Sequence, residues 1–396
     1  MDTGGPITHR FGHPSLRFGL LPVGFRVRGA SGAPLWLVLL AAVTVWSCRE
    51  GSLAELDFRP AALSDGWSIS TPENQGVDPG LLQEAYRSAA GLRNMRSLLI
   101  AKDGRLIGEA YFGGASISEA QPTASVTKSI TSALVGIALR EGLLTSLDQR
   151  MIDFFPEAAG PGLDPRKASI TLRQMLQMPS GHPWEERSGH LNALFSRSNW
   201  IPLIGEFPLT SDPGTEYGYS NLTAHLAGII VARAANASLF DYGQARLFGP
   251  LGMTAPWWPA DSPGYCWGGG DLYLTPRSVA KLGQLYLDEG TWQGSQVVPP
   301  EWVAQSWEAH SYDVYGREIL TNLHGLNYGS LWWSAACGRQ RVDFAWGHGG
   351  QLIVVVRDEG MIVVTTAEHP GLQFGEEAWR KEKAGLELVG QFVSSS

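Results

Sequence analysis

Two blocks of the sequence carry short apolar runs typical of β-strands, and they lie near opposite ends of the chain. In the first, SLLIAKDGRLIGEAYF (97–112), two such runs flank Asp103-Gly104, a dipeptide that favours a tight hairpin turn. In the second, QLIVVVRDEGMIVVTT (351–366), two apolar runs again flank a turn, and strand-like YGSLWWSA and VDFAWGHGG precede it. The pattern therefore predicts strands at both chain ends.

Helical patterns accompany these strands. VDPGLLQEAYRSAAG (77–91) offers Asp78 as a helix cap and Pro79 in the first turn, and GEEAWRKEKAGLELVGQFV (375–393) predicts a last helix. Between the two strand blocks the pattern indicates helix and loop. We expect an α/β fold in which both chain ends form one antiparallel sheet flanked by helices. The expected domain is 65–396, with an α/β lobe (65–114 plus 328–396) and a largely helical inserted lobe (115–327).

The N-terminal segment has the pattern of an export signal. Arg26 and Arg28 precede the apolar run PLWLVLLAAVTVW, which ends at Ser47-Cys48. Residues 1–48 are therefore expected to direct export to the periplasm or the outside of the cell, and 49–64 to form a linker. Cys48 resembles the lipid-bearing cysteine of bacterial lipoproteins, which would attach the protein to a membrane, although Trp46 departs from that pattern. A single membrane anchor is the other interpretation.

Composition narrows the class of function. The chain is 44% hydrophobic and 17% charged, as globular proteins are, and its net charge of −8 with no basic run argues against nucleic-acid binding. Cys266 and Cys337 can either pair in an oxidising compartment or pack as unpaired small hydrophobes. No CxxC or His/Cys cluster has metal-ligand spacing, so neither a metal nor another cofactor is expected.

Ser125 and Lys128 stand three residues apart in ASVTKS (124–129), directly before an apolar run. On a helix this spacing places both side chains on one face. A serine hydroxyl becomes a nucleophile when a base takes its proton, and a lysine can be that base if burial and the helix dipole lower its pKa. Free N–H groups of the first turn can stabilise an oxyanion. The pair therefore predicts a nucleophile and its proton partner.

The same Ser-x-x-Lys pattern occurs a second time, at Ser278 and Lys281 in TPRSVAKLGQLYL (275–287). Thr275 has the position of a helix cap and Pro276 that of the first helical residue. The second copy is therefore interpreted as part of an ordinary amphipathic helix, without a catalytic role.

Two further motifs can complete a site around Ser125. In PGTEYGYSN (213–221), Tyr219 can relay protons and Asn221 can orient a lysine and a substrate carbonyl, with Tyr217 as a competing tyrosine. In AWGHGGQLIVVV (345–356), His348 begins a glycine-rich strand entry. There Gly349 and Gly350 would let the backbone approach a ligand, and Gln351 could supply a strand N–H to an oxyanion hole.

Together and in this order, the three motifs resemble the serine β-lactamase and penicillin-binding-protein superfamily, on its class C side. That superfamily includes D-Ala-D-Ala carboxypeptidases, family VIII carboxylesterases and 6-aminohexanoate-dimer hydrolases. The resemblance covers about Leu98 to Glu368 and extends to the phrases TLRQMLQMPSGHPW and GGGDLYLTPRSVAKLGQLYLDEGTW. It implies that Ser125 is the acyl-accepting nucleophile, Lys128 its proton partner, Tyr219 the general base and acid, and Asn221 the orienting amide.

The third motif departs from the lysine-threonine-glycine of class C β-lactamases. In one alignment His348 takes the place of that lysine. In a second alignment, which the spacing to the hairpin at Arg357 favours slightly, Ala345-Trp346-Gly347 matches the motif and the oxyanion N–H belongs to His348 rather than Gln351. The missing lysine argues against efficient β-lactam hydrolysis, because that cation would bind the carboxylate of the lactam.

SGHPWEER (180–187) is expected to form a substrate-binding loop through Trp184 and Glu185, beside Glu186. An indole next to carboxylates suits apolar acyl chains or amine-bearing substrates. The sequence thus predicts a serine hydrolase that cleaves small esters or amides through an acyl-enzyme. The alternatives are a D-Ala-D-Ala carboxypeptidase, a weak β-lactamase, or a non-catalytic binding protein on the same fold.

Overall fold

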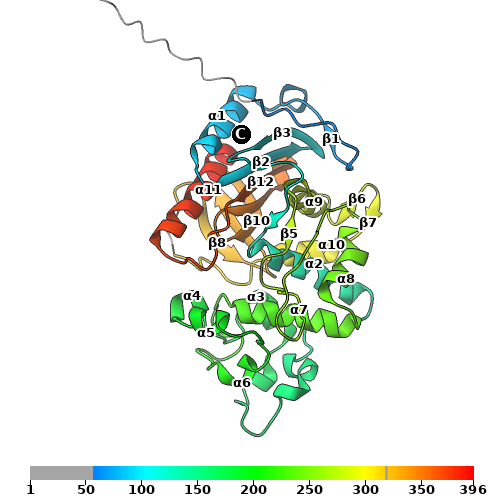
Figure 1. The fold of residues 1–396 in the computed structure, drawn as a ribbon, viewed down its shortest axis with the longest axis vertical. Helices are drawn as coiled ribbons and strands as arrows, with labels where there is room; N and C mark the ends of the chain where they lie inside the picture. The colour runs from blue at the N-terminus through cyan, green and yellow to red at the C-terminus, as the bar shows by residue number, and fades with distance from the viewer. Residues whose placement is uncertain (1–56, 317–319) are drawn as a thin grey trace, which may run out of the picture. The chain divides into compact units, whose positions relative to one another are not determined.

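An eight-stranded sheet joins the two ends of the described chain (Figure 1). Its order is β1-β3-β2-β12-β11-β10-β9-β8, and β12 pairs antiparallel with β2, so the C-terminal strands lie beside the N-terminal hairpin as predicted. All pairs are antiparallel except the short edge strand β1, which runs parallel to β3. The strands are β1 Ser68–Ile69, β2 Met95–Lys102, β3 Arg105–Tyr111, β8 His324–Tyr328, β9 Trp333–Cys337, β10 Gln340–Gly347, β11 Gln351–Val356 and β12 Met361–Ala367.

The turn chemistry of the sequence explains the two hairpins. Asp103 and Gly104 join β2 to β3 with φ values of 49° and 74°, the left-handed conformation that this dipeptide tolerates. The 3-10 turn η1 (Glu73–Gln75) precedes the first helix, and η6 (Arg357–Glu359) joins β11 to β12. Both predicted hairpins are therefore confirmed.

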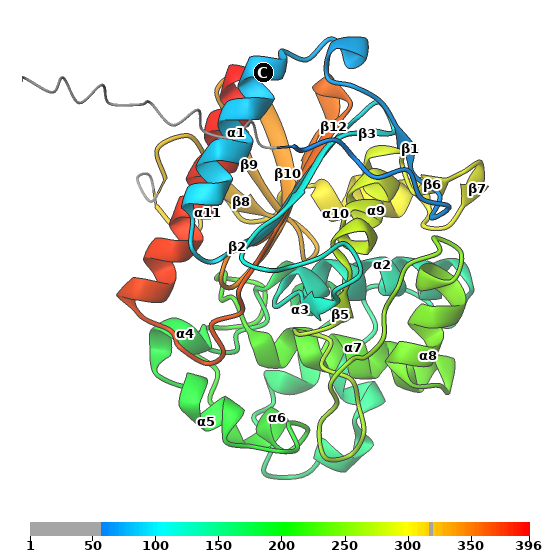
Figure 2. The same cartoon turned by 45° about the horizontal axis from the view of Figure 1, so that its top comes forward.

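Helices cover both faces of the sheet (Figure 2). On one face, α1 (Pro79–Gly91) packs against the final helix α11 (Glu376–Ser395). On the other face lie α9 (Pro276–Leu287), α2 (Val126–Arg140) and α10 (Pro300–Trp307). The Asp78 side chain accepts a hydrogen bond of 2.8 Å from the amide of Gly80, which confirms the predicted cap of α1.

The remaining helices lie below the sheet in Figure 1, where α7 packs against α2, α3 and α8. They are α3 Leu172–Gln177, α4 Glu185–Ser188, α5 Leu191–Phe195, α6 Leu203–Glu206, α7 Asn221–Ala235, α8 Leu239–Gly243 and the π-helical η5 Gln244–Phe248, with 3-10 turns η2 Met151–Phe154, η3 Pro156–Ala158 and η4 Lys167–Ser169. Two short strand pairs also occur in this part of the chain, β4 Gln121–Pro122 with β5 Tyr273–Leu274, and β6 Thr291–Trp292 with β7 Ser295–Gln296.

Helix α2 runs through the centre of the molecule, because nearly its whole length is apolar or small. Its residues from Val126 to Ala138 are buried, and its polar side chains bond to backbone carbonyls; Ser129, for example, donates to the carbonyl of Leu331 at 2.7 Å. Gly136 permits the close approach of α10, since a Cβ atom there would lie 2.2 Å from the Trp302 ring. Helix α2 is thus enclosed by the surrounding chain from Val126 to Ala138.

The computed structural model describes residues 57–316 and 320–396. The predicted export segment, its Cys48 and the first half of the predicted linker (49–56) lie outside the described residues and stay predictions. No single helix within the described ranges is long and apolar enough to cross a membrane; α7 and the following α8–η5 segment pass that test only as a pair bent by 76°.

Cys266 and Cys337 are both buried and unpaired, and the Cys337 thiol donates to the carbonyl of Gly390 at 3.2 Å.

Candidate active site

Ser125 directly precedes the buried helix α2 and is itself half-buried, and its side chain makes no capping hydrogen bond. The residue before it, Ala124, has a φ of 46°, a left-handed conformation that costs a non-glycine residue about 1 kcal/mol. Strain of this kind is often found beside functional groups. Its effect here is to turn the chain sharply into α2 at the nucleophile position.

Lys128 lies one turn further along α2, with only 1% of its surface exposed. Its ammonium donates to Ser125 Oγ at 2.8 Å, to Asn221 Oδ1 at 2.8 Å and to the carbonyl of Gly269 at 2.7 Å. Burial lowers its pKa from 10.5 to about 8, against the opposing charges of Glu186, Glu185 and Asp271. A lysine with this pKa is still mostly protonated at pH 7, but it has a minor neutral population that can accept a proton, and this population grows as the pH rises toward 8.

Asn221 is placed by the start of α7. The Ser220 side chain caps the helix by accepting from the amide of Thr223 at 3.1 Å. Glu185 is fully buried against the same turn and accepts from Ser220 Oγ at 2.7 Å, Asn221 N at 2.9 Å and Leu222 N at 3.2 Å. Burial raises the pKa of Glu185 to about 7, although these hydrogen bonds act in the opposite direction. Glu185 therefore fixes the turn that presents Asn221 to Lys128.

Tyr219 approaches the same centre from the preceding loop. Its ring lies 4.8 Å from Lys128 Nζ, an arrangement that favours a cation–π contact, and it lines a cavity together with Ser125. Burial raises the pKa of Tyr219 well above its usual value, while Ser125 has a smaller, lowering effect. The competing Tyr217 lines neither cavity described below and packs edge-on against Trp184. The geometry thus brings Tyr219, not Tyr217, to the serine.

His348 follows the end of β10 and has acceptors at both ring nitrogens. Nδ1 lies 2.8 Å from Glu382 Oε2, and Nε2 lies 3.0 Å from the carbonyl of Gln373. Burial lowers the pKa of His348, but the hydrogen bond and charge of Glu382 outweigh it, so the pKa lies above its usual value. Two acceptors suit an imidazolium, which donates from both nitrogens. The His348 ring also stacks on Phe374 at 4.6 Å.

Two backbone amides at the nucleophile, those of Ser125 and His348, are candidates for binding a reacting carbonyl oxygen. The end of β10 comes very close to the segment before α2, since a Cβ atom on Gly347 would lie only 2.6 Å from the carbonyl of Thr123. Within the described parts of the chain, neither the amide of Ser125 nor that of His348 has a hydrogen-bond partner. Gln351, in contrast, pairs with Gly347 in the β10–β11 ladder. This geometry favours the second alignment, with His348 N–H as oxyanion donor.

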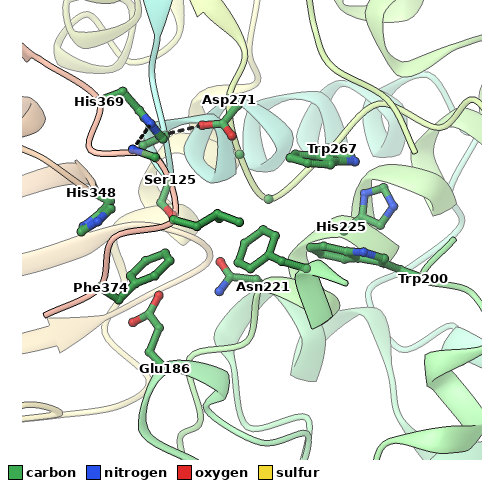
Figure 3. A pocket seen from close by; sticks show the side chains of 16 residues that line it. Ser125, Glu186, Trp200, Asn221, His225, Trp267, Asp271, His348, His369 and Phe374 are labelled. Atoms are coloured by element: carbon green, nitrogen blue, oxygen red, sulfur yellow. Dashed lines mark hydrogen bonds and ion pairs between the residues drawn. The ribbon is translucent and has the colours of Figure 1, made fainter. Parts of the chain in front are cut away.

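Two cavities meet at Ser125, and they share Glu186, His348 and Phe374. The first, the His225 cavity, has a volume of about 70 Å³ (Figure 3), and its other principal lining residues are Trp200, His225, Trp267, Asp271, His369 and Leu372. The second, the Trp346 cavity, has a volume of about 490 Å³, and its other principal lining residues are Trp184, Arg187, Tyr219, Tyr315, Trp333, Trp346, Trp379 and Glu382. A substrate bound to Ser125 therefore has room on two sides of its reacting carbonyl.

Several predicted binding residues are not brought to this centre. Gly349, Gly350 and Gln351 line neither cavity, and the buried side chain of Gln351 instead bonds to the backbone of Ala367. Glu185 points into the start of α7, so the expectation that it binds substrate does not fit the structure. Trp184 does line the Trp346 cavity, as predicted, and its neighbour Glu186 is the carboxylate that faces both cavities.

The structure also adds groups that the sequence did not reveal. The carbonyl of Gly269 binds Lys128, and its signal was the run Gly268-Gly269-Gly270, whose lack of side chains permits that approach. His225, on α7, and Arg187, whose guanidinium lies 3.8 Å from the Trp184 ring centroid, also line the cavities. Neither carried a recognisable sequence signal.

The second Ser-x-x-Lys pair lies in α9, away from both cavities. Lys281 donates to the carbonyl of Gly252 at 2.7 Å, and Ser278 Oγ accepts from the amide of Thr254 at 2.8 Å. This pair therefore fixes a neighbouring loop. Across the described ranges, no group of three or more His, Cys, Asp or Glu side chains is arranged to hold a metal ion.

This fold and the centre at Ser125 define a serine hydrolase. A family model described as Beta-lactamase matches residues 84–387, and the chain belongs to this family.

Comparison with individual proteins agrees with that assignment. A 6-aminohexanoate-dimer hydrolase of Paenarthrobacter ureafaciens is 23% identical over 282 residues, which cover 67% of this chain and 71% of that enzyme. A lovastatin esterase of Penicillium rubens is 29% identical over 151 residues, 33% of this chain and 37% of the esterase. The octameric penicillin-binding protein homologue from Pyrococcus abyssi has the same fold, with a TM-score of 0.59, 17% identity and coverage of 79% and 77% of the two chains.

Proposed function

We propose that this protein cleaves small esters or amides through an acyl-enzyme on Ser125. The observation that carries the proposal is the contact between Lys128 Nζ and Ser125 Oγ at 2.8 Å, made by a buried lysine whose pKa is lowered to about 8. A base of this strength matches the task of activating a serine hydroxyl near neutral pH.

In the acylation step, neutral Lys128 takes the proton of Ser125 while Oγ attacks the substrate carbonyl. The carbonyl oxygen becomes an oxyanion and accepts hydrogen bonds from the amides of Ser125 and His348. Asn221 Oδ1 and the carbonyl of Gly269 hold the resulting ammonium of Lys128 in place. Collapse of the intermediate breaks the bond to the leaving group, which departs with a proton.

Tyr219 is proposed to carry that proton. Because its pKa lies well above the usual value, the phenol is neutral and acts first as a donor. It gives its proton to the leaving alcohol or amine and regains one from Lys128. In deacylation, a water attacks the acyl group, its proton returns through the same pair, and Ser125 is restored. The resemblance implies that Tyr219 is the general base and acid, and in this assignment it acts as the acid first.

The Trp346 cavity supports a preference for apolar acyl or leaving groups. Its walls are mostly aromatic, and among its lining residues the charges are mixed, with Glu186 and Glu382 against Arg187 and His348. No lysine occupies the position that binds a carboxylate in class C β-lactamases. We therefore place neutral or cationic short-chain esters and amides ahead of carboxylate-bearing analogues. The names of the hydrolase and esterase relatives are consistent with such substrates.

A burst assay with a chromogenic short-chain ester, run beside a chromogenic cephalosporin, tests the proposal. We expect a burst with the ester, equal to one acyl group per protein and absent in Ser125→Ala. A burst with both substrates would favour the carboxypeptidase or β-lactamase alternative. No burst with either, in protein whose fold is verified by circular dichroism, would favour a non-catalytic binding protein.

A further inference from the structure

A buried histidine in the wall of the first cavity takes no part in the proposed chemistry. His225 is fully buried on α7, one helical turn after Asn221, so the two side chains share the helix face that looks toward Ser125 (Figure 3). It packs edge-on against Trp200, with ring centroids 5.0 Å apart. It contacts neither Ser125 nor Lys128 through any hydrogen bond.

The carboxylate of Asp261 determines which nitrogen of His225 carries the proton. His225 Nε2 lies 3.2 Å from Asp261 Oδ2, and both side chains are essentially excluded from solvent, with 0% and 1% exposed. Asp261 Oδ1 accepts from the amide of Tyr265 at 2.8 Å, which fixes the carboxylate. An ionised carboxylate only accepts hydrogen bonds, so Nε2 must donate. In the neutral imidazole, Nδ1 is then left as an acceptor.

That acceptor has no partner. Among residues 57–316 and 320–396, His225 Nδ1 is buried and receives no hydrogen bond. An unpaired buried polar atom costs about 1–3 kcal/mol, and such exceptions in native proteins call for an explanation. Because His225 lines the cavity that opens at Ser125, a bound ligand is the available partner.

The residues around His225 indicate which kind of ligand group would donate a hydrogen bond to Nδ1. Glu186, Asp271 and His348 line the same cavity, and Asp261 lies behind His225, so three carboxylates stand against one imidazolium. Asp271 Oδ1 also lies 3.1 Å from His369 Nε2. Trp200 and Trp267 supply aromatic surface beside it. Aromatic faces and carboxylates both favour an organic cation over an anion.

We propose that the His225 cavity is a subsite for a substrate arm ending in a primary ammonium group, which donates a hydrogen bond to His225 Nδ1. The proposal rests on the function proposed above in one respect only, since it takes the arm to belong to a molecule that reacts at Ser125. His225 is a specificity-determining residue and Asp261 a positioning residue that sets its tautomer.

Binding to the Ser125→Ala protein tests the subsite without turnover. The probes are pentylamine and butyl methyl ether, two chains of equal length. Pentylamine ends in a donor, and the ether carries an acceptor oxygen next to its terminal methyl group. The readout is titration calorimetry or the fluorescence of Trp200 and Trp267. We expect pentylamine to bind about 10-fold more tightly or better. Equal affinities, or tighter binding of the ether, would overturn the proposal.

Asp261→Asn, made in the Ser125→Ala protein, tests whether the tautomer of His225 determines which probe binds. The oxygen of the introduced amide can keep the bond to the Tyr265 amide, and the NH₂ group then donates to His225 Nε2, which forces the proton onto Nδ1. The cavity then offers a donor, so the order of the two probes should reverse. An unchanged preference in folded protein would refute the role of His225, because the charge and the aromatic surface alone would then explain amine binding.

Two further variants complete the design. His225→Phe keeps the aromatic volume and should reduce pentylamine binding to the level of the ether. His324→Phe, at an exposed position of strand β8, should change nothing. In wild-type protein, pentylamine should inhibit ester hydrolysis competitively. Amine binding without any ester burst would reject the proposed hydrolase function alone, and a burst without amine preference would reject the subsite alone.

Discussion

The two Ser-x-x-Lys pairs of this chain have the same sequence spacing and very different surroundings. Lys128 lies in the first turn of α2 and Lys281 in the middle of α9, and both are buried, with 1% and 2% of their surface exposed. Burial lowers the pKa of both. Lys128, however, contacts its own serine and two further acceptors beside open cavities, whereas Lys281 bonds to the backbone of Gly252.

The comparison shows that a buried lysine with a lowered pKa, three residues after a serine, is not enough to make an active site. The first pair is the proposed reactive one because a left-handed Ala124 precedes it, Asn221 at the start of α7 contacts its lysine, and Ser125 lines two cavities. The second pair has its serine occupied by the Thr254 amide. Five predictions test this difference between the two pairs, in order of decreasing expected effect.

Ser125→Ala should lower kcat/KM for a short-chain ester by about 10⁴-fold or more, because the only proposed nucleophile is removed. Acyl-enzyme formation, measured by intact-protein mass spectrometry, should disappear. Ser278→Ala is the matched control and should keep full activity. Hydrolysis at the wild-type rate by Ser125→Ala would show that the first pair is no more catalytic than the second.

Lys128→Ala and Tyr219→Phe should each lower kcat by about 10²- to 10⁴-fold, the range for loss of a proton-transfer group. The double variant should be little worse than the worse single one, since both residues serve one proton path. Tyr217→Phe is the control, and it should have little effect on kcat. Fully additive losses would mean that the two residues act independently.

The pH profile should follow Lys128. Below its pKa of about 8 the amine is protonated and cannot take the serine proton, so kcat/KM should rise with pH and level off above about 8. Well below the midpoint the slope should approach about tenfold per pH unit. Lys281→Met should leave the midpoint unchanged. A flat profile between pH 6 and 9 would argue against lysine as the base.

Glu186→Gln and Glu185→Gln distinguish the roles of two adjacent acids, which the sequence alone does not tell apart. Glu186 faces both cavities, so its loss should reduce the preference for cationic over neutral substrates by a few-fold, measured as a ratio of kcat/KM values. Glu185→Gln should instead lower thermal stability and kcat, because it loosens the turn that holds Asn221. A reduced cation preference in Glu185→Gln alone would reverse this assignment.

Ser278→Ala should destabilise the fold by about 1 kcal/mol, because the amide of Thr254 loses its acceptor. The change is measured by chemical denaturation, with kcat/KM of the folded protein as the internal reference. A stability loss without a rate loss is the behaviour expected of a structural pair. A rate loss at unchanged stability would give the second pair an unforeseen functional role.

Local signals made much of the fold predictable. Asp103-Gly104 forces a turn, Asp78-Pro79 starts a helix, and the apolar runs around them have the period of strands. The Ser125–Lys128 spacing places both groups on one helix face irrespective of the rest of the fold. These features depend on a few neighbouring residues, which the sequence displays directly.

The rest of the site depends on tertiary contacts. Glu185 and Glu186 lie in a four-residue helix too short to show a periodic pattern, so nothing in the sequence tells which one faces inward. His225 sits in a helix that is apolar on nearly every side, where a lone histidine has the appearance of a core residue. Its significance appears only when Asp261, 36 positions later, is seen to bond one nitrogen and leave the other unpaired.

Helix α11 connects the site to a distant part of the surface. Gly375, Trp379 and Glu382, at its start, line the Trp346 cavity, while its last turn lies beside α1 (Figure 1). Its 20 residues correspond to about 30 Å of helix. A label attached to an exposed position in the last turn of α11 would thus be held about one helix length away from the incoming substrate. That turn is accordingly a suitable point for attaching this hydrolase to a solid support without blocking the Trp346 cavity.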